Sequence, residues 1–248
     1  MSGLRDRLKT IILPGFRTGH TQYVDHVKAS FQDDCRWLDA GGGRRIFHDA
    51  FDGERELVKR AKSVVVCDVD STALSDHASV TDTICSNLES IPLPPNSQDF
   101  ITCGMVVEHL AEPLECFREF ERLLDNGGTL IIHTVNLWGY PTLLAIIAKL
   151  IPAGIRKAII GKITGRLDED IYPTYYRCNT ARKVKRLMHS ANLQVEVKHI
   201  NHGPLFSLLP LYFVELLYIR ITSINLFRSL RGQLLITVTK QAPDVPTS

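Results

Sequence analysis

The chain has little excess charge of either sign, no paired-cysteine motif and no uninterrupted apolar run of the length that crosses a bilayer. Its 248 residues carry 29 Lys and Arg against 27 Asp and Glu, a formal net charge of +2. Nucleic-acid-binding proteins usually concentrate positive charge, so we expect no nucleic-acid partner. The six cysteines show no C-x-x-C pair and no metal-ligand spacing, which favours packed, reduced thiols and predicts no metal site.

A secretory leader is also missing from the sequence pattern. The first apolar run, residues 11–13, is too short for a signal peptide. We therefore expect a cytoplasmic protein. The length and the 44% hydrophobic content are typical of one large folded domain or a domain with insertions.

The middle of the chain alternates between strand and helix patterns. Short β-branched or apolar runs predict strands, and apolar residues at three- and four-residue steps predict helices. Strand–helix alternation indicates a parallel sheet with helices on both faces. After the run at 37–38, the predicted strands are 63–67, 83–86, 100–103, 129–134, 193–200 and 231–240, and the predicted helices include 53–61, 113–124 and 181–191.

Asp39 and three consecutive glycines, Gly41 to Gly43, end the first predicted strand. This order is typical of a tight turn that approaches a ligand closely, because glycine adopts positive φ values and has no Cβ. If a helix follows, its free N–H groups face the ligand. Glycine-rich turns occur in many folds, so the turn indicates a binding loop only together with the residues that follow the other strands.

Polar residues or glycines follow five successive predicted strands, where ligands bind in open α/β sheets. They are Asp39 with the glycines, Asp68, Asn87 with Leu88, the segment from Met105 to His109, and Asn136. A carboxylate at the end of the second predicted strand suits a ribose, because its two oxygens accept hydrogen bonds from two adjacent hydroxyls. Asp68 is the expected ribose ligand, and Asp70 could instead cap the next helix. Asn87 suits an adenine amino group, with the Leu88 N–H beside it, or is a simple turn residue.

The stretch from Trp37 to Asn136 resembles the class I S-adenosylmethionine-dependent methyltransferases, in the group of the ubiquinone and menaquinone enzymes. LDAGGG (38–43) resembles the acid-then-glycine first motif, and VVCDVDSTAL (65–74) the second-strand motif. NLESIPLPPNSQDFITC (87–103) and MVVEHLAEPLECFREFERLLDNGGTLIIHTVN (105–136) resemble the next two motifs. Arg45, Asn87 and Asn126 depart from the family pattern without removing a group that cofactor binding needs.

The resemblance implies a Rossmann-like, doubly wound, seven-stranded α/β sheet, mostly parallel with an antiparallel last strand, carrying helical lid insertions. It also implies S-adenosylmethionine as the cofactor. The residues expected to bind it are Asp39, Gly41, Gly43, Asp68, Asn87, Leu88 and Met105. A nicotinamide-binding Rossmann protein is the less favoured class, because Ile46 stands where a GxGxxG motif has its third glycine.

His109 is the candidate catalytic residue. Methyl transfer from a sulfonium is a displacement at an activated carbon, so the protein mainly positions the nucleophile and excludes water. If the nucleophile is a hydroxyl, a base assists, and histidine titrates in the right range for this task. The alternative is that His109 packs against the next helix or shapes the pocket.

Two apolar stretches outside the resemblance, 137–163 and 204–230, are expected to decide the substrate. Pro141 and Pro152 divide the first into helical pieces too short for a bilayer, which takes ~20 apolar residues. Interspersed Lys and Arg favour an interfacial helix, and a lid over the cofactor is the alternative. In the second, Glu215 and Arg220 argue against a membrane span. Its apolar character predicts burial against the lid, a second subunit or a membrane.

The polar-aromatic segment 168–180 is the expected acceptor site. Arg177 suits a phosphate or carboxylate, and three tyrosines suit an apolar part; a packed loop that orders the lid is the alternative. The expected acceptor-binding residues are Tyr172, Tyr175, Tyr176 and Arg177.

The sequence thus predicts five segments: an N-terminal helical segment (1–34), a cofactor-binding core (35–136), a lid or substrate insertion (137–180), a C-terminal part of the core with an apolar insertion (181–240), and a disordered tail (241–248). The predicted activity is methyl transfer to a small, glycan or lipid-linked acceptor, on oxygen first and carbon second. A catalytically silent methyltransferase-like scaffold is the alternative. Peripheral contact with the inner membrane surface and assembly into a homodimer are also expected. The sequence leaves the identity of the acceptor open.

Overall fold

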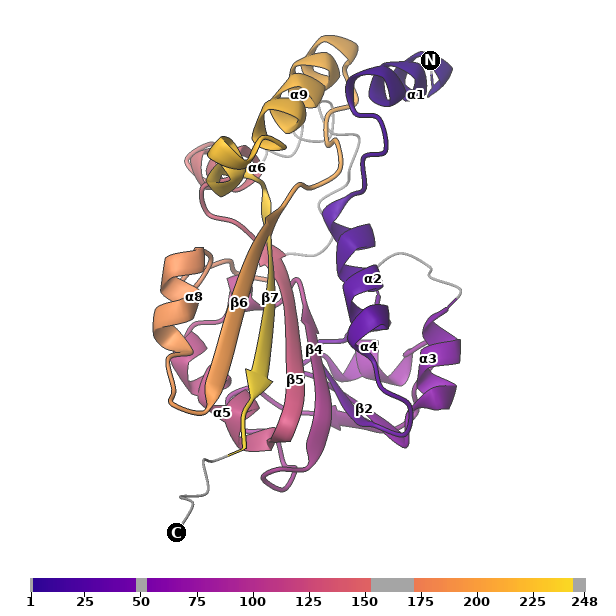
Figure 1. Cartoon of the computed structure of the whole chain (residues 1–248), viewed down its shortest axis with the longest axis vertical. Coiled ribbons are helices and arrows are strands. Elements are labelled where there is room, and N and C mark those ends of the chain that lie inside the picture. Colours follow the sequence, from indigo (N-terminus) through magenta and orange to yellow (C-terminus); the bar gives the residue numbers. More distant parts are fainter. Residues whose placement is uncertain (1, 48–52, 153–171, 243–248) are drawn as a thin grey trace. The chain divides into compact units, whose positions relative to one another are not determined.

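The computed structural model describes residues 2–47, 53–152 and 172–242, and the chain folds into two units (Figure 1). Unit 1 comprises Met1–Gln22, Val135–Pro173 and His199–Leu234, and unit 2 comprises Tyr23–Thr134, Thr174–Lys198 and Leu235–Ser248. The N-terminal segment predicted at 1–34 is thus shared between the two units. The predicted second helical piece at 153–163, the first residues of the acceptor segment and most of the tail lie outside the described residues.

A seven-stranded sheet runs in the order β3-β2-β1-β4-β5-β7-β6, and it is parallel apart from the last strand of the chain, β7. The strands are β1 (Arg36–Ala40), β2 (Ser63–Asp68), β3 (Thr83–Cys85), β4 (Gln98–Gly104), β5 (Leu124–Val135), β6 (Leu193–Ile200) and β7 (Gln233–Lys240). This arrangement confirms the predicted fold class.

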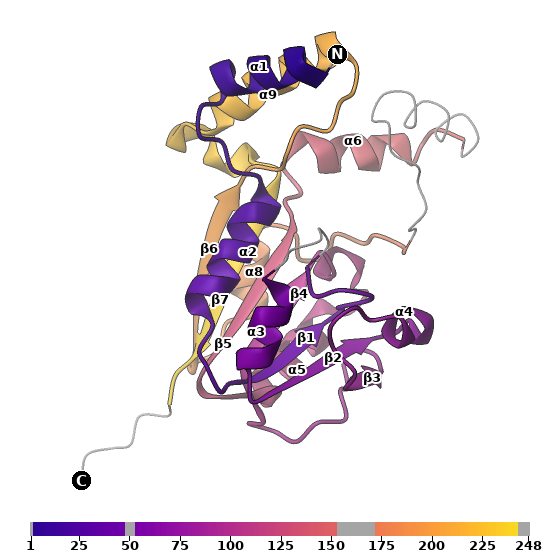
Figure 2. The same cartoon turned by 90° about the vertical axis from the view of Figure 1, so that its right-hand side faces the viewer.

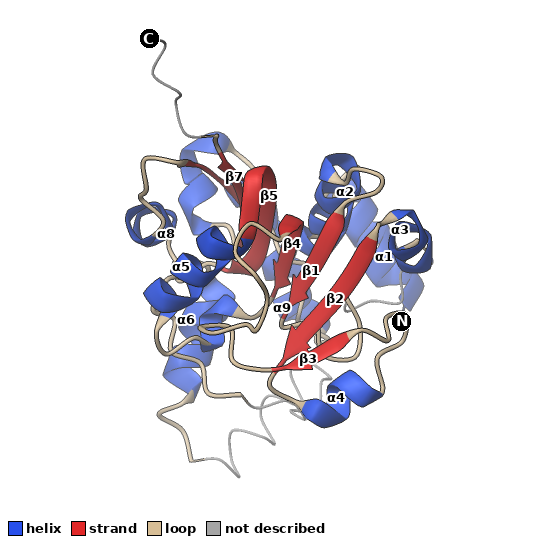
Figure 3. Ribbon diagram, turned by 90° about the horizontal axis from the view of Figure 1, so that it is seen from below, coloured by secondary structure: helices blue, strands red, loops and turns tan. Residues whose placement is uncertain are grey.

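The central strands are apolar along their whole length because both faces are covered. In β1, Trp37, Leu38 and Ala40 are fully buried, and Trp37 pairs with Val64 of β2 and Phe100 of β4. Continuous rather than alternating apolar runs are typical of such parallel strands. In unit 2, α2 (Gly19–Ser30) and α3 (Glu54–Arg60) cover one face of the sheet, and α5 (Pro113–Leu123) and α8 (Ala181–Leu187) cover the other (Figure 3).

The helices of unit 2 follow from simple sequence signals. Pro113 occupies the first turn of α5 (Pro113–Leu123), where its missing N–H costs nothing, and Phe117 and Phe120 lie on the buried side. The remaining helices are α2 (Gly19–Ser30), which begins in unit 1, α3 (Glu54–Arg60), α4 (Ser71–Ser75), the 3-10 helix η1 (Val107–His109) and α8 (Ala181–Leu187).

Among the described residues, the elements that lie wholly within unit 1 are helical. They are α1 (Ser2–Ile12), α6 (Tyr140–Ala148), α9 (Leu209–Thr222) and the 3-10 helix η2 (Asn225–Leu230). Helix α1 lies along α9 (Figure 2), and together they bury an apolar cluster centred on Leu13, Tyr212, Leu216 and Ile219. Among the described residues, no helix combines the length and the apolar character that a membrane span requires.

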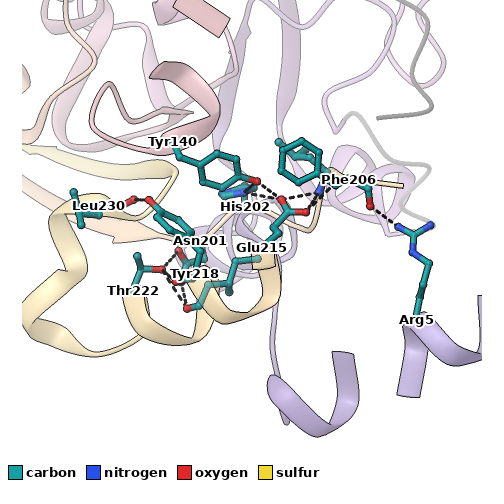
Figure 4. Close-up of polar contacts among 11 residues, drawn as sticks. Arg5, Tyr140, Asn201, His202, Phe206, Glu215, Tyr218, Thr222 and Leu230 are labelled. Carbon is teal, nitrogen blue, oxygen red and sulfur yellow. Dashed lines mark hydrogen bonds and ion pairs between the residues drawn. The ribbon is translucent and has the colours of Figure 1, made fainter. Parts of the chain in front are cut away.

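A buried carboxylate ties the helices of unit 1 together (Figure 4). The Glu215 side chain on α9 is fully buried, and its two oxygens accept hydrogen bonds from the N–H groups of Leu205 (2.8 and 2.9 Å) and Phe206 (3.0 Å). The Tyr140 hydroxyl donates to the same carboxylate, and His202 Nε2 lies 3.4 Å from it. Glu215 therefore joins α6, α9 and the segment before α9.

These donors set the ionisation of Glu215. Burial alone would raise the pKa of Glu215, but hydrogen bonds from His202, the Phe206 N–H, Tyr140 and the Leu205 N–H outweigh it and lower the pKa below the ordinary 4.5. A carboxylate with a lowered folded-state pKa contributes stability that is fully present above its unfolded-state value. That stability is lost as the pH falls through the folded-state value.

We expect Glu215→Ala to lower the free energy of unfolding by about 3 kcal/mol at pH 7, because it leaves the Leu205 and Phe206 N–H groups and the Tyr140 hydroxyl without their shared acceptor. The difference from the unchanged chain should shrink as the pH falls below 4.5. Urea unfolding at pH 7 and pH 4 measures both effects. Glu115→Ala, on exposed α5 surface, is the control and should change stability by less than about 0.5 kcal/mol. An equal loss at both pH values would contradict the assignment.

Candidate functional site

The loop after β1 requires glycine at its first position. Gly41 has φ +79°, and its N–H donates to the Cys67 carbonyl at 2.7 Å. A Cβ at Gly41 would lie 2.3 Å from Cγ2 of Val106, in the loop after β4. Since real contacts are never that short, the loop packs against Val106 as closely as backbone allows. Gly43 also has a positive φ, +51°.

Gly42, which is not among the expected cofactor-binding residues, is needed for a different reason. A Cβ there would lie 2.3 Å from Oδ2 of Asp39. Asp39 is itself buried, and its Oδ1 accepts a hydrogen bond from the Thr102 hydroxyl at 2.6 Å; that hydroxyl accepts from Trp37 Nε1 at 2.8 Å. Asp39 thus lies directly beneath the loop, and its buried Oδ2 has no hydrogen-bond partner among the described residues.

The environment of Asp39 disfavours a charge. Burial raises the pKa of Asp39 well above its ordinary 3.8, and the charges of Glu54 and Asp68 raise it further, while the hydrogen bond from Thr102 lowers it. A protonated Asp39 is a hydrogen-bond donor as well as an acceptor. The first strand therefore ends in a buried, polar support for the glycine loop.

Asp68 and Asp70 differ in the groups that their carboxylates bind. Asp70 is the N-cap of α4, where its Oδ1 accepts from the N–H groups of Thr72 (2.9 Å) and Ala73 (3.0 Å). Asp68 instead faces the glycine loop, and its Oδ2 accepts from the Gly43 N–H at 3.0 Å. Its Oδ1 accepts from the Asp70 N–H at 2.9 Å. The carboxylate is therefore fixed at the end of β2, beside the loop.

The two predicted cofactor residues that follow β3 differ in their exposure to solvent. Asn87 is exposed, and its carbonyl accepts from the Ser90 N–H at 3.2 Å, which closes a turn. Leu88 is buried. The turn accounts for Asn87 locally, and its contact with a nucleobase stays a prediction.

The loop after β4 is strained at the predicted cofactor residue Met105. Met105 has φ +59°, a left-handed conformation that costs a non-glycine residue roughly 1–2 kcal/mol. Its N–H donates to the His133 carbonyl at 2.7 Å, which holds the strain in place. Such strain clusters at functional sites. No residue type in the sequence signals it, because methionine is not a turn former.

His109 ends η1 and is half-buried, with its N–H donating to the Val106 carbonyl at 2.8 Å. The neighbouring Glu108 points inward: it is buried, and its Oε2 accepts from the Thr134 hydroxyl at 2.8 Å. Asn179 Nδ2 in turn donates to Thr134 Oγ1 at 2.8 Å. A buried polar chain from three separate segments thus positions the turn that carries His109.

The predicted acceptor segment docks on this same turn. The N–H groups of Tyr175 (2.9 Å) and Tyr176 (3.1 Å) both donate to the Glu108 carbonyl. Arg177 donates to the Ala111 carbonyl and to Glu112 Oε1 (3.0 Å), and its guanidinium lies over the Tyr175 ring. The structure therefore brings Tyr175, Tyr176 and Arg177 to the His109 turn, with Arg177 held by protein groups. Tyr172 is an exposed side chain of unit 1.

Two strand-end residues have structural roles. Asn136, which the sequence pattern placed among the ligand-facing residues, is buried, and its Nδ2 donates to the carbonyls of Ser229 (2.8 Å) and Arg231 (2.7 Å). The side-chain amide of Asn136 is therefore hydrogen-bonded to backbone carbonyls at the end of η2 and just after it. His133 in β5 is buried and stacks on Tyr23, with ring centroids 5.0 Å apart.

A cavity of about 340 Å³ lies at the end of the sheet opposite the glycine loop. Asp34, Asp99 and Gly127 are among its lining residues, at the amino ends of the strands. It is separate from the glycine loop, because the two lie at opposite ends of β1. In the described part of the chain, no cluster of His, Cys, Asp and Glu has the arrangement of a metal site.

Part of the chain matches a known protein family. Residues 38–132 match the model of the family described as methyltransferase domain. The bifunctional biotin biosynthesis protein BioHC of Cellvibrio japonicus is 28% identical over 119 residues, which cover 46% of this chain and 22% of that protein. The ubiquinone biosynthesis O-methyltransferase of Xanthomonas campestris is 38% identical over 65 residues, 24% of this chain and 27% of that protein. The matched segments thus span less than a third of these relatives.

The fold has solved counterparts. A SAM-dependent methyltransferase from Aquifex aeolicus superposes with a TM-score of 0.52 at 14% identity, covering 95% of this chain and 98% of that one. At this identity the likeness shows the fold. Together with the family match, it confirms the resemblance and the cofactor predicted from the first four motifs.

Proposed function

We propose that this chain, whose residues 38–132 form a class I S-adenosylmethionine-dependent methyltransferase domain, transfers a methyl group to a small, glycan or lipid-linked acceptor. The observation that carries the proposal is the contact between Asp68 and Gly43. It holds a carboxylate at the end of β2, 3.0 Å from the N–H of a loop without side chains. A ribose needs such a carboxylate, and the rest of a nucleoside needs such a loop.

The residues present fit S-adenosylmethionine. The side chains of Val106 and Asp39 occupy the positions that a Cβ on Gly41 or Gly42 would take, so this loop would present only backbone to a ligand. Asp68 would hold the ribose hydroxyls, Asn87 and Leu88 the adenine, and Met105 would line the cofactor. The bound cofactor supplies an activated methyl carbon; the chain supplies position, exclusion of water and a proton acceptor.

Oxygen is the proposed methyl acceptor, with carbon second. The name of the ubiquinone biosynthesis O-methyltransferase, similar over 65 residues, supports oxygen. His109 would take the hydroxyl proton, and the Glu108–Thr134–Asn179 chain would position its turn. Tyr175, Tyr176 and Arg177, docked on that turn, would contact the acceptor. We further propose a cytoplasmic enzyme at the inner membrane surface; a homodimer is the other proposed assembly.

The proposal is tested by comparing Asp68→Ala with Asp70→Ala. Asp68→Ala should weaken S-adenosylmethionine binding more than tenfold, a loss of ~1.4 kcal/mol or more. Asp70→Ala removes the N-cap of α4 and should cost roughly 1 kcal/mol of stability, with affinity unchanged within about threefold. Isothermal titration calorimetry and thermal melting separate the two effects. Unchanged affinity in Asp68→Ala would remove it from the site, and no binding by the unchanged chain would favour the silent scaffold.

A further inference from the structure

We propose that unit 1 docks on an anionic lipid surface through an exposed apolar face formed by α9 and η2. This inference extends the membrane contact proposed above, and it rests on the proposed function only for the use of that contact. The exposed apolar residues of α9 and η2 and the exposed Arg220 and Arg228 on these same elements all belong to unit 1.

Helix α9 is apolar on two opposite sides. Its buried side packs Tyr212, Leu216 and Ile219 into unit 1, with Glu215 anchored beneath them. At 100° per residue, the opposite side carries another apolar set. Its members and their exposed fractions are Phe213 (42%), Val214 (62%), Leu217 (40%) and Ile221 (51%). A helix of this kind has a second face for which the described residues of unit 1 provide no core.

The same character continues beyond the helix. In η2 all six residues are exposed, and they include Leu226 (81%), Phe227 (38%) and Leu230 (41%). Among the described residues, every other exposed large apolar side chain also belongs to unit 1, except Val69 and Tyr175. Contiguous exposed apolar surface marks an interaction site or an aggregation liability. We therefore interpret the exposed apolar residues of α9 and η2, which we call the α9–η2 face, as a docking surface.

Charge selects that occupant. The described residues of unit 1 contain eight Lys and Arg against two acids, Asp6 and Glu215, and Glu215 is buried. The formal net charge of these residues is +6, although the whole chain carries only +2. Arg220 on α9 and Arg228 in η2 are exposed beside the apolar side chains. A second copy of unit 1 would bring the same positive charge, whereas anionic lipid headgroups are complementary to it.

The geometry favours a helix that lies on the membrane. Helix α9 has 14 residues, and a bilayer crossing takes ~20. A short helix with apolar side chains on one side and basic residues at its flank settles into the interface between headgroups and acyl chains. The buried side of α9 remains engaged with α1, so this mode requires no unfolding of unit 1.

The test is sedimentation of the full chain with phosphatidylcholine vesicles and with vesicles containing one quarter phosphatidylglycerol. We expect binding to the anionic vesicles, and at least tenfold weaker partitioning to the neutral ones. The double variant Val214→Asn, Leu217→Asn should partition at least tenfold more weakly to anionic vesicles. Both side chains are exposed, so folding should be retained, as thermal melting will show.

Two double variants that remove the same amount of charge test whether vesicle binding depends on basic residues of α9 and η2 or on the net charge of the chain. Arg220→Gln with Arg228→Gln should lower partitioning by more than tenfold, since each basic residue at an anionic surface contributes roughly fivefold. Lys59→Gln with Arg118→Gln removes the same charge from exposed positions of unit 2 and should have an effect below about threefold. Equal losses in the two pairs would overturn the assignment of the face.

Three further results would overturn the proposed lipid-docking face. The first is a chain that stays in the supernatant with anionic vesicles, and the second is unchanged partitioning of the Val214→Asn, Leu217→Asn variant. The third is a dimer, detected by light scattering, that dissociates in this variant. S-adenosylmethionine affinity is measured without vesicles for every variant and should not change. If vesicles bind and the cofactor does not, the proposed function fails and the lipid surface stands; the reverse result overturns only the lipid surface.

Discussion

Replacing Gly41 by alanine should weaken S-adenosylmethionine binding about a hundredfold, or ~2.7 kcal/mol. The new Cβ would meet Val106 Cγ2 at 2.3 Å on a residue whose φ is +79°. A left-handed alanine costs roughly 1–2 kcal/mol, and overpacking typically adds 1–3 kcal/mol. The loop relieves this strain by moving away from Val106, and cofactor binding must then restore the original geometry. Calorimetric titration of the folded variant measures the loss.

Gly127 provides the matched control. Its φ is +81°, and a Cβ there has nothing within 4 Å. Gly127→Ala therefore introduces the same backbone strain without the clash, and it should lose stability while binding the cofactor within about threefold. Adding Val106→Ala to Gly41→Ala removes the nearest clashing atoms and should restore at least tenfold of the affinity. If the Gly41 and Gly127 variants bind equally well, the close-approach account of the loop is wrong.

Replacing His109 by alanine should lower the rate of labelled-methyl transfer to an oxygen acceptor roughly a hundredfold, the usual contribution of a general base. Affinity for S-adenosylmethionine should change less than threefold, because the fold of the turn is held by backbone bonds and by Glu108. The rate is measured with tritiated cofactor and lipid or aqueous cell extract as acceptor. Added imidazole should restore part of the rate, which a merely structural histidine would not show.

The matched deletion is His189→Ala. His189 is exposed after α8 in unit 2, and its loss should leave the transfer rate unchanged. A fall of less than threefold in the His109 variant would assign that residue to packing. A loss of rate with no imidazole rescue would assign it to shaping the pocket.

The elements whose signals are local were predictable from sequence. The β-branched run at 63–67 and the apolar spacing at 113–124 correspond to β2 and α5 to within a residue or two. The distance between the glycine loop and Asp68 indicated which carboxylate faces the loop, whereas Asp70 caps α4; the contact of Asp68 with a ribose stays a prediction. Such signals depend on spacing along the chain, which a sequence states directly.

Features that depend on distant segments were not predictable. Nothing local indicates that Met105 is left-handed, because the His133 carbonyl that holds it lies in another strand. Glu215 served in the sequence only as an argument against a membrane span. Its role as a buried anchor depends on Tyr140, 75 residues away. The apolar pattern of 204–230 predicted burial, and only packing reveals that α9 buries one side and exposes the other.

The measurement that tests the account most directly is a crystal structure of the full chain with S-adenosylhomocysteine. The account predicts the ribose hydroxyls within hydrogen-bond distance of the Asp68 carboxylate, with the amino-acid tail over the backbone of Gly41 to Gly43. A nucleoside bound elsewhere, such as the cavity beside Asp34 and Asp99, or a glycine loop filled by side chains of the protein, would contradict it.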